Sequence, residues 1–431
     1  MKQLSFIVIG AGDRGLTYTK QMLSMPEKYK VVGVADLNPE KCARYRRRYG
    51  LTEEQCFSDW HDILAKPKMA DIAIIATSDM GHYEPAMKAI ELGYDLLLEK
   101  PVAPTERECC EFANAARKAG VKVLVCHVLR YTPFYKKIKS IIKSGMIGEV
   151  MSIEQTEAIG DRHFAHSFVR GNWGNTDRSA PMLLAKTCHD IDIIQWLMDK
   201  KCEKVHSFGS LTYFTEANAP AGAPVHCYGG DCPEYENCPY ASEKIYIDNV
   251  FDDWFKGTFR NVVGTHEDVT DDELREALKT SNYGRCVFHA GNNLCDHQVM
   301  NMQFTGGATA QLTVNAFNRG GRYTRVYGTK GELYAHMSDT EITVHTFADN
   351  KKQTVSVQET EEAITGGHGG GDKGMVFELY DYLTGIYDGF SVADIDVSVY
   401  NHMLGFAAEE SRHESTVVDI DEFCKKHEFE Y

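Results

Sequence analysis

The sequence predicts an α/β protein in which a doubly wound parallel sheet is followed by a second α/β domain with a largely antiparallel, open sheet. Three observations support this fold class. Short apolar runs alternate with helical patterns in the first third, a glycine-rich turn follows the first run, and later runs alternate polar and apolar residues between hairpin turns. Because 431 residues exceed what one hydrophobic core usually serves, we expect two domains, residues 1–128 and 129–431.

Five apolar runs form the predicted parallel sheet. They are LSFIVIG (4–10), KVVGVAD (30–36), ADIAIIAT (70–77), YDLLLEK (94–100) and VKVLVCH (121–127). Runs without polar alternation are typical of strands that helices cover on both faces. Helix signals separate them, because Thr105 and Glu108 have capping-box spacing and Gly50, Gly93 and Gly120 stand where helices end.

A glycine pattern joins the first strand to the first helix. Gly10, Gly12 and Gly15 have the spacing G-x-G-x-x-G, which lets the backbone turn tightly, approach a pyrophosphate and pack the helix on the sheet. Free N–H groups at the start of a helix favour the phosphate charge. We therefore expect a dinucleotide at this turn, with Asp13 and Arg14 also lining it.

Asp36 ends the second strand, where a carboxylate can accept hydrogen bonds from an adenosine ribose. A 2′-phosphate at that position would be repelled, so NAD is preferred over NADP. Lys41 and Arg44 lie nearby and leave NADP open, and Asp36 has an alternative role as a cap of the helix that begins at NPEK.

The second domain contains alternating runs and hairpin turns, including Gly306-Gly307 and Lys330-Gly331. The runs are EVMSIEQTEA (149–158), KVHSFGSLTYF (204–214), HQVMNMQFTGGATAQLTVNAF (297–317), TRVYGTKGELYAHM (324–337) and EITVHTF (341–347). An antiparallel sheet with helices on one face fits this pattern. C-terminal helices over 374–413 are predicted to pack back on the body.

A cysteine-rich insertion over about 225–290 interrupts these strands. Cys227, Cys232 and Cys238 lie in one turn-rich stretch, and Cys286 can return as a fourth ligand. Zinc prefers four thiolates in a tetrahedral array, so a structural zinc site is one prediction. Buried free thiols, or a disulfide, are the alternatives.

The composition is that of an ordinary globular protein, with 43% hydrophobic and 25% charged residues. A net charge of −16 opposes binding to nucleic acid or to an anionic membrane surface. No stretch is long and apolar enough to span a bilayer, and the N-terminal apolar run lacks the form of a signal peptide. Thirteen cysteines without a leader point to reduced thiols or metal ligands, so the expected location is the cytoplasm.

Four ordered motifs carry a family resemblance: the glycine turn, IIATSDMGHYE (74–84), LLEKPVA (97–103) and CHDIDIIQWL (188–197). Together they resemble the Gfo/Idh/MocA oxidoreductases, the group of glucose-fructose oxidoreductase and inositol dehydrogenase. The resemblance implies a Rossmann domain that binds NAD over 1–128 and a domain for substrate and oligomerisation over 129–431. It further implies nicotinamide-dependent oxidation or reduction of sugars and polyols by a homodimer or homotetramer.

The resemblance also assigns residues. Lys100 takes the catalytic position of the EKP motif, and His189 takes that of the proton-transfer residue. Oxidation of a secondary alcohol needs a base for the hydroxyl proton while hydride leaves for the nicotinamide. Histidine suits this role near neutral pH, and Lys100 either becomes neutral beside the charged ring or stays a cation that orients the hydroxyl. Further expected cofactor contacts are Thr77, His82, Glu99, Lys100 and Arg130.

One position departs from the family pattern. Members commonly carry an aspartate one turn before the histidine, whereas this chain has Ala185. Lys186 lies three residues before His189 on the same predicted helical face, and is expected to reach the same substrate. Asp190 and Asp192 are expected to be scaffold residues of that helix.

Loops supply the remaining candidates for substrate binding. Tyr131 follows the fifth strand, and the segment RGNWGNTDRSAP (170–181) combines Trp173 with Arg178, a composition suited to a sugar packed on an indole. His368 stands in the glycine stretch GGHGGGD (366–372), which we expect to act as a substrate lid.

Three functions remain open from the sequence. The first is an NAD-dependent oxidoreductase that acts on a secondary hydroxyl of a sugar, polyol or glycoside. The second is a glycoside-cleaving enzyme that oxidises C3 transiently, eliminates the aglycone and recycles the cofactor. The third is a nucleotide-binding sensor without catalysis.

Overall fold

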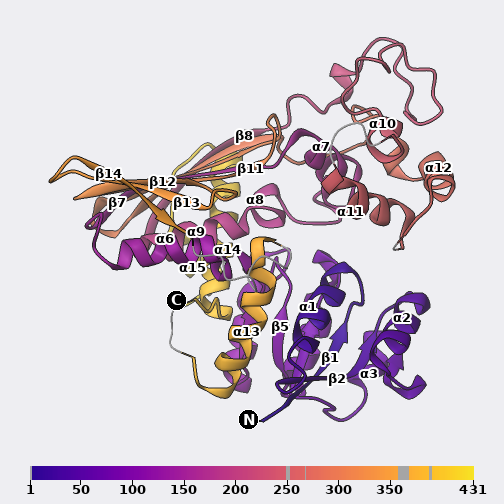
Figure 1. Cartoon of the computed structure of the whole chain (residues 1–431), viewed down its shortest axis with the longest axis horizontal. Coiled ribbons are helices and arrows are strands. Elements are labelled where there is room, and N and C mark those ends of the chain that lie inside the picture. The colour runs from indigo at the N-terminus through magenta and orange to yellow at the C-terminus, as the bar shows by residue number, and fades with distance from the viewer. Residues whose placement is uncertain (1, 249–252, 267, 358–367, 388–390) are drawn as a thin grey trace.

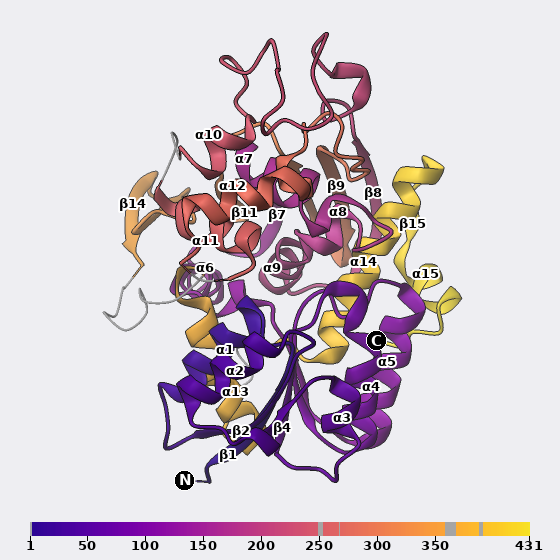
Figure 2. The same cartoon turned by 90° about the vertical axis from the view of Figure 1, so that its right-hand side faces the viewer.

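The computed structural model describes residues 2–248, 253–266, 268–357, 368–387 and 391–431. This part of the chain forms two sheets, each with its own helices, that lie one above the other in Figure 2. The arrangement confirms the predicted α/β class with a parallel sheet followed by a mostly antiparallel one.

The first sheet is parallel and has the strand order β3-β2-β1-β4-β5-β6. Its strands are β1 (Leu4–Ile9), β2 (Tyr29–Ala35), β3 (Cys56–Phe57), β4 (Ile72–Ile75), β5 (Asp95–Leu98) and β6 (Val123–Val125). The central strands are buried on both faces, which explains their uninterrupted apolar runs. This order is that of a doubly wound Rossmann sheet, whose ligands bind at the carboxyl ends of the strands.

Helices cover both faces of the Rossmann sheet (Figure 2). They are α1 (Asp13–Leu23), α2 (Pro39–Tyr49), α3 (Trp60–Leu64), α4 (Tyr83–Glu91) and α5 (Glu106–Ala119). The Thr105 side chain accepts the N–H of Glu108, as the capping-box spacing predicts. Gly50 and Gly120 end their helices with φ of 68° and 66°, a left-handed conformation that favours glycine.

The second sheet has the order β14-β13-β12-β11-β7-β10-β9-β8-β15. Its strands are β7 (Val150–Ala158), β8 (Cys202–Ser210), β9 (His297–Phe304), β10 (Thr309–Asn315), β11 (Gly321–Gly328), β12 (Gly331–His336), β13 (Glu341–Thr346), β14 (Lys351–Ser356) and β15 (Val418–Asp419). Among these strands only β7 and β10 pair in parallel. Helices α6 (Pro133–Lys143), α9 (Cys188–Met198) and α14 (Ile395–Glu414) lie on one face of the sheet and leave the other open (Figure 1).

The insertion between β8 and β9 projects beyond the end of the second sheet (Figure 1). It carries the helices α10 (Ser242–Tyr246), α11 (Asp253–Gly264) and α12 (Asp271–Thr280). A small separate core that includes Tyr246, Phe259 and Leu274 holds these helices together. The rest of the insertion is loops, and residues 249–252 and 267 lie outside the described part.

The chain returns to the Rossmann domain near its end. Helix α13 (Gly371–Thr384) packs beside α1, and the Tyr29 hydroxyl donates to the Val376 carbonyl at 2.7 Å. The Tyr380 hydroxyl also donates to the Lys2 carbonyl at 2.8 Å. The chain ends in α14, β15 and α15 (Ile420–Lys426). No described helix is both long and apolar enough to cross a membrane.

Candidate functional site

The glycine turn has the geometry that a pyrophosphate requires. Gly10 has a φ of 94°, and an added Cβ would lie 2.4 Å from the Ala76 carbonyl oxygen. A Cβ on Gly15 would lie 2.1 Å from the Gly10 oxygen. Gly12 provides no side-chain cap to α1, and Asp13 is exposed at its first turn. The turn therefore leaves free N–H groups at the carboxyl edge of the sheet, where a dinucleotide fits.

Asp36 lies beside this turn. Its carboxylate accepts the N–H groups of Ala11 and Asn38, each at 2.8 Å, and its side chain is 11% exposed. Asn38, rather than Asp36, caps α2, because the Asn38 side chain accepts the N–H of Glu40. The alternative role of Asp36 as the helix cap is therefore wrong, and its position at the turn suits a ribose.

Arg14 and Glu99 contact each other beneath the turn. Arg14 Nε lies 2.7 Å from Glu99 Oε1, and Arg14 Nη2 lies 2.6 Å from Asp372 Oδ1 in α13. Glu99 also accepts the Tyr18 hydroxyl. Burial alone would raise the pKa of Glu99, but the positive charges of Arg14 and Lys100 outweigh it and lower that pKa. Both predicted cofactor contacts are thus engaged in an internal network that holds the turn.

His82 needs a correction. We expected it beside the nicotinamide ribose, but it is 1% exposed. Its Nδ1 lies 2.7 Å from the Pro101 oxygen and its Nε2 lies 3.1 Å from the Thr77 oxygen. The imidazole therefore ties the end of β4 to the end of β5, and both of its ring nitrogens contact backbone carbonyls inside the protein.

Arg130 and Tyr131 also need a correction. Arg130 forms two hydrogen bonds with Asp192, at 2.6 and 2.7 Å, and both side chains are buried. Tyr131 is 2% exposed and its hydroxyl accepts the N–H of Ala393 at 3.3 Å. Their polar groups are used inside the protein, so the structure does not support contacts with cofactor or substrate. Asp192 is a scaffold residue, as expected.

Lys100 links the Rossmann domain to the segment before His189. Its Nζ donates to the Ala185 carbonyl at 2.7 Å, at the end of α8 (Met182–Ala185). His189 is the second residue of α9, is 7% exposed and packs edge-on against the buried His127, with ring centroids 5.8 Å apart. A lysine that follows β5 thus contacts the second domain four residues before His189.

Lys186 lies in a break between two helices, which the sequence analysis did not predict. Helix α8 ends at Ala185 and α9 begins at Cys188, so Lys186 and His189 do not share one helical face. Lys186 Nζ lies 3.4 Å from Glu157 Oε1 on β7, and Arg322 Nε on β11 lies 2.7 Å from Glu157 Oε2. Arg322 Nε also donates to Asp190 at 3.0 Å.

Glu157 and Arg322 were missed by the sequence analysis. Gln155 and Glu157 occupy the inward positions of β7, where the alternation Ile153, Gln155, Glu157 replaces apolar residues with polar ones. Polar side chains at the buried positions of an alternating strand are the signal that could have found them.

The predicted substrate loop reaches the Rossmann domain. Trp173 is 36% exposed, and its Nε1 donates to Asp79 Oδ2 at 3.1 Å. The Ser179 hydroxyl donates to the same carboxylate at 2.6 Å. Arg178 is exposed. The glycine stretch is described only from His368 onward, and the His368 side chain lies outside the described part.

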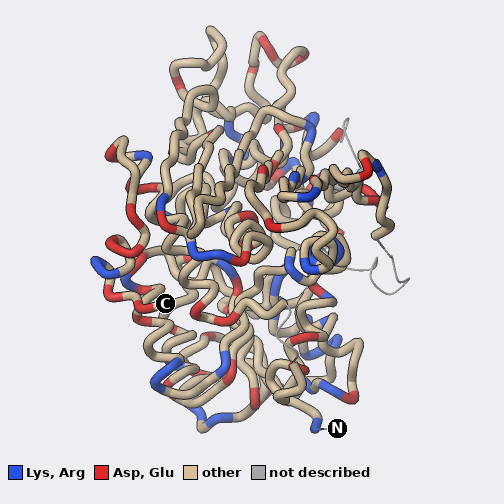
Figure 3. The backbone as a smooth tube through the Cα atoms, turned by 90° about the vertical axis from the view of Figure 1, so that its left-hand side faces the viewer, with Lys and Arg blue, Asp and Glu red and all other residues tan. Residues whose placement is uncertain are grey.

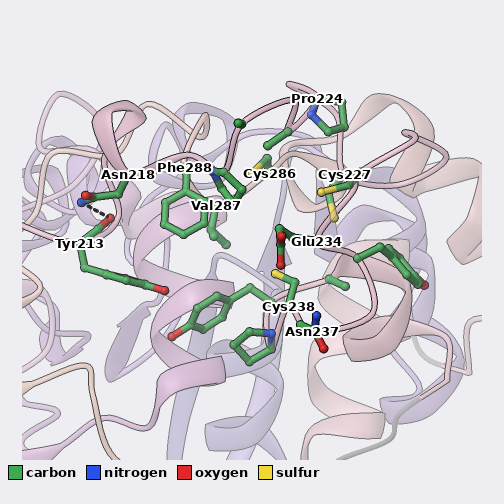
Figure 4. Close-up of a pocket in the computed structure, with 18 of the residues that line it drawn as sticks. Tyr213, Asn218, Pro224, Cys227, Glu234, Asn237, Cys238, Cys286, Val287 and Phe288 are labelled. Atoms are coloured by element: carbon green, nitrogen blue, oxygen red, sulfur yellow. Dashed lines mark hydrogen bonds between the residues drawn. The ribbon is translucent and has the colours of Figure 1, made fainter.

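The four cysteines of the insertion line one cavity of about 410 Å³, together with Tyr213 and Phe288 (Figure 4). All four are free thiols, and no three His, Cys, Asp or Glu side chains among the described residues are arranged to hold a metal ion. Burial raises the pKa of Cys238 and of Cys286. The arrangement of the four cysteines therefore does not support the zinc prediction.

Comparisons with known proteins agree with this architecture. Residues 4–127 match a family model described as oxidoreductase family, NAD-binding Rossmann fold, and residues 139–420 match one described as oxidoreductase family, C-terminal alpha/beta domain. The putative oxidoreductase YteT of Bacillus subtilis (strain 168) is 26% identical over 425 residues, which cover 91% of this chain and 94% of that protein.

Two further relatives have more specific names. The inositol 2-dehydrogenase/D-chiro-inositol 3-dehydrogenase of Lactiplantibacillus plantarum is 25% identical over 202 residues, which are 47% of this chain and 54% of that protein. A structure of levoglucosan dehydrogenase with NADH and L-sorbose aligns with a TM-score of 0.68 at 20% identity, covering 97% of this chain and 99% of that one. At this identity the structural likeness shows the fold. Because the two family models span most of the sequence, the chain belongs to the Gfo/Idh/MocA family of oxidoreductases.

Proposed function

We propose that the protein is an NAD-dependent dehydrogenase that oxidises a secondary hydroxyl of a sugar, polyol or glycoside. The observation that carries this proposal is the contact between Lys100 Nζ and the Ala185 carbonyl, four residues before His189. This contact supports a site in which the Lys100 ammonium group and the His189 imidazole act together where the two domains meet. The names of relatives that act on inositol support a polyol or sugar as substrate.

NAD supplies the acceptor for hydride when it is bound. The chain's own residues perform the remaining tasks. The glycine turn and the start of α1 hold the pyrophosphate, and Asp36 accepts hydrogen bonds from the ribose. The Lys100 ammonium group orients the substrate hydroxyl and stabilises its developing negative charge, and His189 accepts the hydroxyl proton. Trp173, held by Asp79, offers its indole face to the sugar ring.

The preference for NAD over NADP rests on Asp36. Its carboxylate lies at the ribose end of the turn, and a 2′-phosphate there would meet a like charge. Lys41 Nζ lies 3.7 Å from the same carboxylate and reduces this repulsion without removing it. NAD is therefore the proposed cofactor.

A second candidate function is the cleavage of glycosides through transient oxidation at C3. In that reaction the ketone acidifies the C2 proton, a base removes it, the aglycone leaves from C1, water adds, and hydride returns from the reduced cofactor. The proximity of Lys186 to Glu157 favours keeping this candidate, because elimination needs an acid or base beyond Lys100 and His189.

One experiment separates the candidates. The protein is incubated in deuterated water with NAD and a panel of polyols, sugars and aryl glycosides, and NADH, free aglycone and deuterium at C2 are measured. Accumulating NADH supports the dehydrogenase, whereas aglycone with deuterium at C2 and no net NADH supports glycoside cleavage. Tight NAD binding without turnover of any panel member would instead show a nucleotide-binding sensor and contradict both.

A further inference from the structure

A buried carboxylate lies in the substrate domain, and the proposed dehydrogenase reaction gives it no role. Glu157 is the penultimate residue of β7, and its side chain is 4% exposed. Arg322 stands directly opposite it on the neighbouring antiparallel strand β11. An isolated buried carboxylate is costly, so its neighbours must compensate its charge.

Arg322 compensates the charge of Glu157 without satisfying its hydrogen bonds. Arg322 Nε lies 2.7 Å from Glu157 Oε2, but its N–H is directed at Asp190 Oδ1, 3.0 Å away. Glu157 Oε2 has no hydrogen-bond partner within the described ranges of the chain. The carboxylate therefore keeps one lone-pair site that can take a proton.

Lys186 supplies the other half of the pair. Its Nζ lies 3.4 Å from Glu157 Oε1, and its side chain is 19% exposed. It follows Ala185, whose carbonyl accepts the ammonium group of Lys100. The break between α8 and α9 thus directs Lys186 toward Glu157 while its backbone adjoins the proposed reaction centre.

The surroundings shift the two groups toward a shared proton. Burial raises the pKa of Glu157 although Arg322 and Lys186 oppose this, and burial lowers the pKa of Lys186 although Glu157 opposes this. The charged and titratable groups that face the pair are Arg322 on β11, Asp190 on α9, Lys100 after β5 and His163 on α7 (Asp161–Phe164). Moving a proton between the two groups therefore costs less than it would in water.

We propose that Glu157 and Lys186 form a second acid–base pair of the substrate site, which exchanges the hydrogen on the carbon next to the carbonyl that oxidation creates. This inference rests on the proposed dehydrogenase function. In this step the Lys186 ammonium group first passes one proton to Glu157 Oε1, 3.4 Å away, and becomes a neutral amine. Lys186 takes the proton of the C–H bond, and the electron pair of that bond forms an enolate that the Lys100 ammonium stabilises. The reverse step returns a proton from Lys186, and no electrons leave or enter.

The shared proton can be tested without any substrate. The protein is labelled with acetic anhydride across a pH series, and acetylation is quantified at each lysine by mass spectrometry. We expect the pH midpoint of Lys186 to lie about one unit or more below that of the exposed Lys118 on α5. Glu157→Gln should lower the midpoint further, because the carboxylate opposes the shift. A midpoint for Lys186 at or above that of Lys118 would overturn the proposal.

The exchange itself is tested in deuterated water with NAD and two probes, myo-inositol and levoglucosan. For a probe that is oxidised, the recovered alcohol should carry deuterium next to the oxidised carbon. Glu157→Gln and Lys186→Met should each lower the ratio of deuterium incorporated to NADH formed about 100-fold relative to the wild type. Glu154→Gln, at an exposed position of the same strand, is the matched control.

The outcomes distinguish the pair from the dehydrogenase. Deuterium incorporation that persists in both variants with intact thermal melting would refute the pair and leave the dehydrogenase standing. If neither probe yields NADH, the pH midpoint of Lys186 acetylation still tests the shared proton. The wider panel of polyols, sugars and aryl glycosides then tests the dehydrogenase function. If Glu157→Gln does not fold, Lys186→Met carries the exchange test alone.

Discussion

Lys100 is the residue on which the proposed chemistry most depends, because its ammonium group joins the end of β5 to the Ala185 carbonyl. We expect Lys100→Ala to lower the rate of NADH formation about 100-fold or more, since both the orientation of the hydroxyl and the stabilisation of its charge are lost. NAD binding, measured by fluorescence titration, should stay within a few-fold. Lys118→Ala, at an exposed position of α5, is the control. Unchanged turnover in Lys100→Ala would remove Lys100 from the mechanism.

Asp36 should determine the choice between NAD and NADP. We expect Asp36→Ser to weaken NAD binding about ten-fold, because the ribose loses a charged hydrogen-bond acceptor. NADP binding should strengthen, because Lys41 and Arg44 remain and the repelling carboxylate is gone. Dissociation constants for both nucleotides check this. If the two constants move together, the loss reflects only the N–H of Ala11 that Asp36 no longer accepts.

Single residues were predictable where a backbone constraint or an ordered motif fixed them. Gly10 and Gly15 could be found because any side chain there would collide with the backbone. His82 was misplaced because its motif fixes its position in the chain, whereas the two carbonyls that it contacts are set by how β4 and β5 end. Glu157 and Arg322 become neighbours only through the register of β7 against β11, which no local pattern encodes.

Elements were predictable where periodicity and caps agreed, as in β1, β2 and α5. The break between α8 and α9 was not, because Lys186 and Thr187 have no glycine or proline to mark it. Buried polar contacts favour the break there, since it turns Lys186 toward Glu157 and frees the Ala185 carbonyl for Lys100. Tertiary partners thus override the local helical pattern.

Three elements meet at the Arg14 network, which gives stability a defined dependence on pH. Arg14 on α1 contacts Glu99 after β5 and Asp372 on α13. Because the folded pKa of Glu99 is lowered, its contribution is present above the ordinary glutamate pKa and is lost as pH falls through the lowered value. Glu99→Gln should cost about 3 kcal/mol or more at pH 7.

Glu99→Gln should also weaken the dependence of the melting temperature on pH in the acid range. Between pH 5 and pH 3 the melting temperature of the Glu99→Gln variant should fall less than that of the wild type, because the variant has no proton to take up at this position. Melting curves at several pH values measure this, with Glu84→Gln on α4 as the control. Parallel curves would show that the network adds no pH-dependent stability.

At the scale of the whole molecule, segments that are distant in the chain make the contacts between the two domains. Helix α13 lies far along the chain but packs on the Rossmann domain, and Trp173 of the second domain donates to Asp79 of the first. Such contacts depend on the docking of complete domains, so the sequence predicts the domains better than their junction. Acidic and basic residues are interspersed over both domains (Figure 3), which agrees with a junction made by specific pairs rather than by opposite net charges.

The open face of the nine-stranded sheet should bury itself against a second copy of the chain. Helices cover the other face, and Phe208 on β8 and Tyr334 on β12 are 60% and 46% exposed. We therefore expect a homodimer or homotetramer by light scattering. Phe208→Asp should shift the measured mass toward that of one chain, because it places a charge in the contact.

Because each copy carries a net charge of −16, added salt should favour the assembly by screening the repulsion between copies. A wild-type monomer at micromolar concentration would contradict this expectation, and Val417→Asp, exposed outside the strands, is the control.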